Sequence, residues 1–106
     1  MPANVETTAL AATTLVLPAE LTHRQAAATL ASLRQAWLAQ TAGPLVLDAS
    51  ALRQFDSAAL AVLLECRRSL LAQGRGLQLQ GLPEALGRMA ALYGVDQLLG
   101  LPGPSR

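Results

Sequence analysis

Apolar residues recur along this chain at two spacings, one typical of helices and one typical of strands. Two short segments rich in Val, Thr and Leu, Val5 to Leu10 and Thr13 to Leu17, are predicted to pair as an opening antiparallel hairpin. Apolar residues then fall every three or four positions, and Thr22 followed by Gln25 has the capping-box pattern that starts helices. This pattern predicts a first helix from about Thr22 to Gln40.

The second half of the chain repeats a strand-then-helix pattern. A continuous apolar run from Leu45 to Leu47 is suited to a central strand, and Asp48 to Phe55 is predicted to turn into the next helix. That helix is predicted from about Ser57 to Gln73, where Gly74 ends it. A half-buried strand is predicted from Leu77 to Gln80, and a third helix from Pro83 to Gly94. A last short strand or turn from Val95 to Leu99 and a flexible tail from Gly100 to Arg106 complete the chain. The buried stripe of the third helix is predicted to be Leu86, Met89, Ala90 and Leu92.

The order of these elements predicts the fold class. Strands that alternate with helices are typical of an α/β fold in which right-handed crossovers join parallel strands. We therefore expect a mixed sheet of four or five strands, antiparallel at its start, with three main helices packed on it. Residues 1–106 are expected to form one domain with a core from about residue 5 to residue 99, because no repeat or second domain is visible.

The predicted helix from Ser57 to Gln73 carries more apolar surface than one core contact needs. At about 100° per residue, one set of its residues points inward, another points outward, and three leucines fall between them. The inward set is Ala59, Leu63, Cys66 and Leu70, the outward set is Ser57, Ala61, Glu65, Arg68 and Ala72, and the intermediate leucines are Leu60, Leu64 and Leu71. Such a surplus apolar edge is typical of a surface that docks another protein.

Ser57 is expected at the N-terminus of this helix, facing outward. Unpaired N–H groups and the positive end of the helix dipole meet there, so the position can hold an anion or dock a partner. The alternative role for Asp56 and Ser57 is simple helix capping, which is compatible with docking. Ala58 and Ala59 favour helix over loop, so Ser57 is expected to be fixed in the cap.

The composition excludes several classes of function. Eight arginines against seven acidic residues leave a formal charge of +1, and only three residues are aromatic, so no nucleic-acid partner is expected. The chain has no lysine, which excludes a phosphate-loop NTPase. No apolar run is long enough to cross a bilayer, and a single cysteine allows no internal disulfide. We therefore expect a soluble, cytoplasmic protein without membrane insertion.

Four further residues are assigned to structural roles. Cys66 and Trp37 lie on the core faces of their helices and are predicted to pack there. His23 is predicted to be a solvated surface residue, because no partner for a triad or a metal site lies near it in sequence. Asp48 is predicted to accept hydrogen bonds from the turn after its strand. No metal site and no cofactor are predicted.

The segment from Leu45 to Leu64 resembles the signature of the STAS domain, the fold shared by anti-sigma-factor antagonists and related modules. The resemblance rests on the apolar strand, on Asp56 and Ser57 opening a leucine-rich helix, and on the strand from Leu77 to Gln80 with its helix. It extends from about Leu15 to Leu99. Three shorter segments are similar to the MlaB type within that family: Leu17 to Leu21, Gly81 to Pro83 and Leu92 to Val95.

The resemblance to the MlaB type implies a function. That type supplies the small cytoplasmic subunit of the inner-membrane ABC transporter that moves phospholipids between the membranes of Gram-negative bacteria. The resemblance implies a non-catalytic protein that binds the ATPase subunit of the transporter, which is itself in complex with the permease. It also implies that this protein associates with the inner membrane only through that partner. The family's interface hydroxyl falls on Ser57. The expected partner-binding residues are Ser57, Asp56, Leu60, Ala61, Leu64 and Arg68.

A regulatory switch is the competing interpretation. As in an anti-sigma-factor antagonist, a partner serine kinase or anti-sigma factor would act on Ser57, and phosphorylation would add about −1.5 to −2 charges beside Asp56. The antagonist branch usually follows the hydroxyl with Ser or Gly and then Gly, whereas Ala58 and Ala59 stand here. An enzyme is the third and least favoured interpretation, because the sequence lacks paired acid and base groups at a plausible site.

Overall fold

Three parallel strands form the main sheet of the computed structural model, which describes residues 13–39 and 43–101. The strands are β1 (Thr13–Val16), β3 (Leu45–Asp48) and β5 (Leu77–Gln80), with β3 in the centre. Two very short strands, β2 (Glu20–Leu21) and β4 (Gln54–Phe55), form a second parallel pair. Every strand pair in the described residues is therefore parallel. The predicted partner strand from Val5 to Leu10 lies outside them.

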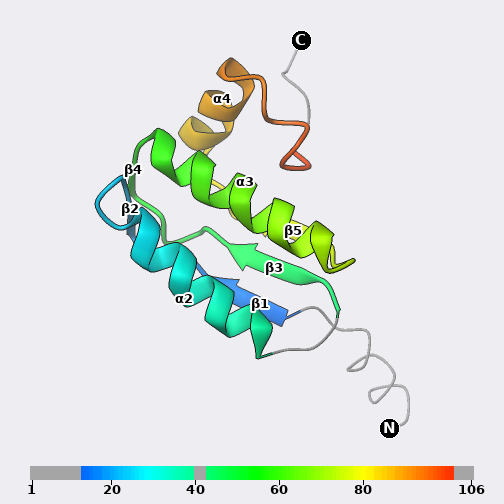
Figure 1. Ribbon diagram of the computed structural model, residues 1–106. Coiled ribbons are helices and arrows are strands. Elements are labelled where there is room, and N and C mark those ends of the chain that lie inside the picture. The colour runs from blue at the N-terminus through cyan, green and yellow to red at the C-terminus, as the bar shows by residue number, and fades with distance from the viewer. Residues whose placement is uncertain (1–12, 40–42, 102–106) are drawn as a thin grey trace, which may run out of the picture.

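Three helices pack with these strands (Figure 1). The helices α2 (Ala26–Leu38) and α3 (Ser57–Ala72) lie side by side over one face of the main sheet, and α4 (Glu84–Leu92) packs against α3. Both crossovers of the main sheet thus pass through a helix, α2 between β1 and β3 and α3 between β3 and β5, as is usual for parallel strands. The α/β fold predicted from the element order is confirmed, and α3 begins at the predicted residue.

The core lies between the main sheet and the inner faces of α2 and α3. The predicted inward set of α3 is confirmed, since Ala59, Leu63, Cys66 and Leu70 are completely buried. Trp37 of α2 is also completely buried, as its position on the core face predicts. The central strand is covered on both faces along its apolar run, whereas β5 alternates half-buried leucines with exposed glutamines.

The first helix begins later than predicted. Thr22 to Gln25 form a turn, in which the Gln25 N–H donates to the Thr22 carbonyl at 3.0 Å, and α2 starts at Ala26. Part of the expected capping box is present, because Oε1 of Gln25 accepts the Thr22 N–H at 2.8 Å. The predicted hydrogen bond between Thr22 and Gln25 is therefore confirmed, but the predicted helix start at Thr22 is wrong. The predicted end at Gln40 lies outside the described residues.

The third helix buries a narrower stripe than predicted. Leu86 and Ala90 are completely buried and Met89 is partly buried, but Leu92 is 81% exposed. Leu92 follows Ala90 by two residues, which is about 200° around a helix, so it faces away from the core. Residues 96–100 form a turn, which decides between the two alternatives for the segment after α4.

A buried arginine connects the end of α2 to the approach to β3. Arg75 is 5% exposed, and its Nε donates to the Gly43 carbonyl at 2.8 Å while its Nη1 donates to the Trp37 carbonyl at 2.8 Å. Trp37 lies in the last turn of α2, where carbonyl groups need donors from outside the helix. Nothing in the sequence pattern identified this arginine.

Candidate functional site

Asp56, rather than Ser57, caps α3. Its backbone is extended (φ −136°, ψ −166°), and its Oδ1 accepts the Ala58 N–H at 2.9 Å. This bond satisfies one of the amide groups that a helix start leaves unpaired. Ser57 becomes the first residue of the helix, with an exposed side chain. The expectation that Ser57 is fixed in the cap is thus wrong by one position, because the neighbouring carboxylate takes that role.

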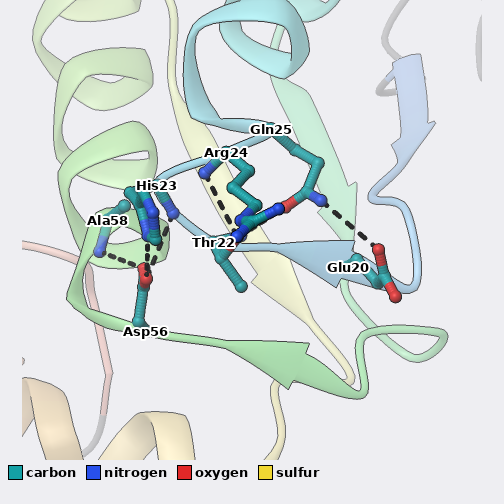
Figure 2. A network of polar contacts seen from close by, with 7 residues as sticks. All are labelled: Glu20, Thr22, His23, Arg24, Gln25, Asp56 and Ala58. Carbon is teal, nitrogen blue, oxygen red and sulfur yellow. Dashed lines mark hydrogen bonds and ion pairs between the residues drawn. The ribbon is translucent and has the colours of Figure 1, made fainter.

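The second oxygen of Asp56 binds a residue 33 positions earlier in the chain (Figure 2). Oδ2 accepts the backbone N–H of His23 at 3.1 Å and lies 3.1 Å from Nδ1 of the same histidine. Both side chains reach solvent, at 76% exposure for His23 and 40% for Asp56. His23 is exposed as predicted, but it has a partner that its sequence neighbourhood did not reveal.

These bonds make Asp56 a stronger acid. The pKa of its carboxyl lies below the ordinary value, first because of the hydrogen bond from the His23 side chain and then because of the His23 backbone N–H. Partial burial acts in the opposite direction, and the Ala58 N–H adds a smaller lowering. Asp56 is therefore ionised at neutral pH and can accept all of these bonds at once.

The outward face of α3 presents most of the predicted partner-binding residues. Ser57, Ala61 and Arg68 are exposed and Leu64 is half-buried. Leu60 is the exception, because it is 3% exposed and belongs to the core. Besides the sheet, both α2 and α4 pack against α3. Leu60 is therefore not available to a partner, and the surface loses one of its predicted residues.

An ion cluster occupies the half of α3 that is distant from Ser57. Glu65 pairs with Arg68 on the same helix through both carboxylate oxygens, and its Oε2 lies 3.4 Å from Nη2 of Arg34 on α2. Arg34 also donates to the Ser69 hydroxyl at 3.4 Å. The pKa of the Glu65 carboxyl is lowered, with the Arg68 hydrogen bond as the largest cause. Arg68 is thus exposed but already paired, and the cluster fixes α2 to α3.

Serine, histidine and aspartate meet at the start of α3, yet their geometry is not that of a hydrolytic triad. A triad needs Asp to orient one ring nitrogen and the other ring nitrogen to accept from the serine hydroxyl. Asp56 does contact Nδ1 of His23, but among the described residues no hydrogen bond joins His23 to Ser57. The imidazole is also open to solvent. These three side chains therefore do not form a triad in this structure.

The remaining candidates have structural roles. Oδ1 of Asp48 accepts the N–H of Ser50 at 2.9 Å and its hydroxyl at 2.5 Å, and the hydroxyl bond is the main reason that the pKa of Asp48 is lowered. The turn role predicted for Asp48 is confirmed. Burial raises the pKa of the Cys66 thiol to about 12. Cys66 is therefore a packed core residue with little thiolate at neutral pH, as predicted.

Other features of the described residues lie away from Ser57 or do not form a site. A surface cavity of about 320 Å³ lies between β1 and α2, lined by Val16, Pro18, Ala28, Thr29, Ser32 and Leu33. Across residues 13–39 and 43–101, no group of three or more His, Cys, Asp or Glu side chains is placed to hold a metal ion. No helix in the same ranges has the length and apolar character to cross a membrane.

The parallel sheet, the paired helices α2 and α3 and the hydroxyl at the start of α3 define a STAS-like α/β domain. The comparison with protein families carries this assignment further. The family model described as "Mlab, STAS domain" matches residues 5–100, which is nearly the whole chain. The chain therefore belongs to this family of STAS-domain proteins. The comparison with curated proteins gives no match.

Proposed function

We propose that this protein is a non-catalytic subunit that docks the ATPase of an inner-membrane ABC system for phospholipid transport. The exposed side chain of Ser57 at the first residue of α3 is the observation that carries the proposal. Membership of the Mlab-type STAS family supports a role in protein–protein contact within such a system. In this proposal the whole chain acts as one domain, lies in the cytoplasm and meets the inner membrane only through its partner.

The proposed docking surface consists of Ser57, Ala61, Leu64 and Arg68, with Asp56 at its edge. Small side chains at Ser57 and Ala61 allow a partner to approach the helix closely, and half-buried Leu64 offers apolar contact beside them. Arg68 contributes together with its partner Glu65 rather than as a single charge. No catalytic step is assigned to these residues, and the function requires only binding.

Binding alone is sufficient for the proposed effect on the ATPase. A subunit that binds the assembled form of a partner, and not its unfolded or dissociated form, shifts the equilibrium towards assembly by mass action. A ligand present at about 100 times its Kd stabilises the bound state by about 2.7 kcal/mol. The expected consequence is a more stable and more active ATPase complex when this protein is present.

Substitution of Ser57 tests the proposed surface. Ser57→Arg places a long charged side chain on the proposed surface, where the original side chain is exposed, so the isolated protein should still fold. We expect loss of co-purification with the ATPase subunit. Ala31→Arg on the exposed side of α2 is the matched control and should bind like the wild type. Retained binding by Ser57→Arg would contradict the proposal.

A phosphorylation switch is the second candidate function, because the exposed hydroxyl of Ser57 is accessible to a kinase. A phosphate there would benefit from the positive end of the α3 dipole and would repel the Asp56 carboxylate. Incubation with a serine kinase encoded next to this protein, followed by intact-mass analysis, tests it. An addition of one phosphate that is lost in Ser57→Ala would support the switch, and an unchanged mass would exclude that kinase as its agent.

A further inference from the structure

One carboxylate connects the starts of two helices. Asp56 caps α3 through Oδ1 and binds the turn before α2 through Oδ2, so each oxygen serves a different element. Figure 2 shows His23, Asp56 and Ala58 gathered in one group. The residue that follows Asp56 in the chain is Ser57. Ser57 therefore directly follows a residue whose carboxylate contacts the starts of both helices.

The turn that carries His23 is itself held by hydrogen bonds. The Thr22 N–H donates to Oε1 of Gln25 at 2.8 Å, and the Arg24 N–H donates to the Thr22 hydroxyl at 3.2 Å. Nε2 of Gln25 donates to Oε1 of Glu20 in β2 at 3.3 Å. This network, also drawn in Figure 2, makes the turn a firm support for the imidazole. The contact between His23 and Asp56 thus joins a hydrogen-bonded turn to the first turn of α3.

Exposure shows what this contact can and cannot do. With its side chain 76% exposed, His23 adds little to the core, and solvent screens its attraction to Asp56. Its effect on global stability should therefore be small. Its effect on local geometry is direct, because Nδ1 and the backbone N–H of one residue both contact the same oxygen. Donation from Nδ1 to the ionised carboxylate requires a proton on Nδ1.

We propose that His23 is a positioning residue of the docking surface, which holds Asp56 so that the first turn of α3 presents Ser57 in the orientation that the partner binds. This inference rests on the proposed function, since it concerns the same surface. It adds a residue from the turn before α2 to a surface otherwise formed by α3. The role of His23 is exerted through Asp56 and requires no direct contact with the partner.

Two substitutions of His23 separate positioning from direct contact. His23→Ala removes the imidazole that contacts Oδ2 of Asp56 and keeps the backbone N–H of residue 23, whereas His23→Asn can place an amide Nδ2–H close to the position of Nδ1 without the ring. We expect His23→Ala to bind the ATPase subunit about threefold to tenfold more weakly, the range of a single lost hydrogen bond. His23→Asn should recover most of this loss. Arg24→Ala, in the same turn but without a contact to Asp56, is the control and should bind like the wild type.

Amide hydrogen exchange supplies a readout that does not depend on the partner. In the isolated protein, the Ala58 amide, which donates to Asp56, should exchange faster in His23→Ala and recover in His23→Asn. Thermal unfolding checks that both variants are folded. Wild-type affinity of His23→Ala would overturn the inference. Equal weakening by His23→Ala and His23→Asn would also overturn it, because the ring itself would then be the contact.

The outcomes also separate this inference from the proposed function. If the wild type binds the ATPase subunit, Ser57→Arg does not and His23→Ala binds normally, then the docking surface stands and the positioning role fails. If the wild type does not bind, or Ser57→Arg binds as well as the wild type, both fail. If Ser57→Arg and His23→Ala are both weakened and His23→Asn recovers, both are supported.

Discussion

Two leucines four residues apart on α3 provide a sharp test of where the core ends and the docking surface begins. Leu60 is 3% exposed and lies in the core, whereas Leu64 is half-buried at its edge. Truncation of a fully buried leucine to alanine costs about 2–5 kcal/mol, from lost burial and from the cavity that remains. We therefore expect Leu60→Ala to lower the free energy of unfolding by about 3 kcal/mol. Leu64→Ala should cost about 1 kcal/mol, because less of its surface is covered.

The assay combines stability with binding. Urea unfolding followed by far-UV circular dichroism gives the free energies, and for a chain of this length each kcal/mol corresponds to about 4 °C in Tm. At a temperature where both variants are folded, Leu60→Ala should bind the ATPase subunit like the wild type, and Leu64→Ala should bind more weakly. A Leu60→Ala variant that lost less than about 1 kcal/mol, or that lost binding without losing stability, would refute the assignment of Leu60 to the core.

Three further predictions concern other parts of the fold. Gly81→Ala should lower the free energy of unfolding in urea by about 2 kcal/mol, because Gly81 has φ +70° and an added Cβ would lie 2.2 Å from Oγ of Ser50. Gly74→Ala is the control and should cost only about 1 kcal/mol, because Gly74 has φ +71° but open space around it. Equal costs for the two variants would contradict the steric argument. Cys66 should react very slowly with a thiol reagent at about pH 8 in the native protein and rapidly in denaturant, because burial raises its pKa to about 12; rapid native reaction would show that the core opens. Because the pKa of Asp56 is lowered in the folded protein, its contribution to stability is present above the carboxyl pKa of the unfolded chain and is lost as the pH falls through the carboxyl pKa of the folded protein. Below about pH 4, the free energy of unfolding should therefore depend less steeply on pH in Asp56→Asn than in the wild type. Identical pH profiles of the two proteins would exclude this linkage.

The helix α3 could be predicted closely from the sequence, because its signals are strong and local. The predicted start at Ser57 and end at Gln73 agree with the observed Ser57–Ala72, and the inward face is correct. A helix of this length repeats its apolar pattern over several turns, so its phase is well determined. The burial of Leu60 is a tertiary effect, because α3 packs against α2, α4 and β5, and the pattern of α3 alone does not show these neighbours.

The parts that escaped prediction depend on contacts between distant segments. The strands β2 and β4 have two residues each, too few for any periodicity, and form only because they pair with each other. The contact between His23 and Asp56 joins residues 33 positions apart, and neither residue is unusual in its own neighbourhood. The predicted core position of Leu92 is wrong because Leu92 lies about 200° from Ala90 around α4, so the helical phase fails near the end of this helix.

The buried guanidinium of Arg75 has a practical consequence. It holds the carbonyl groups of Trp37 and Gly43, on either side of residues 40–42, so the two flanks of that connection are anchored by a residue from elsewhere in the chain. A connection whose ends are pinned independently tolerates added sequence, since lengthening a closed loop costs little entropy. In Figure 1 the C-terminal end of α2 points away from β2 and β4. A fluorescent or affinity tag inserted there would report on partner capture while leaving Ser57 unobstructed.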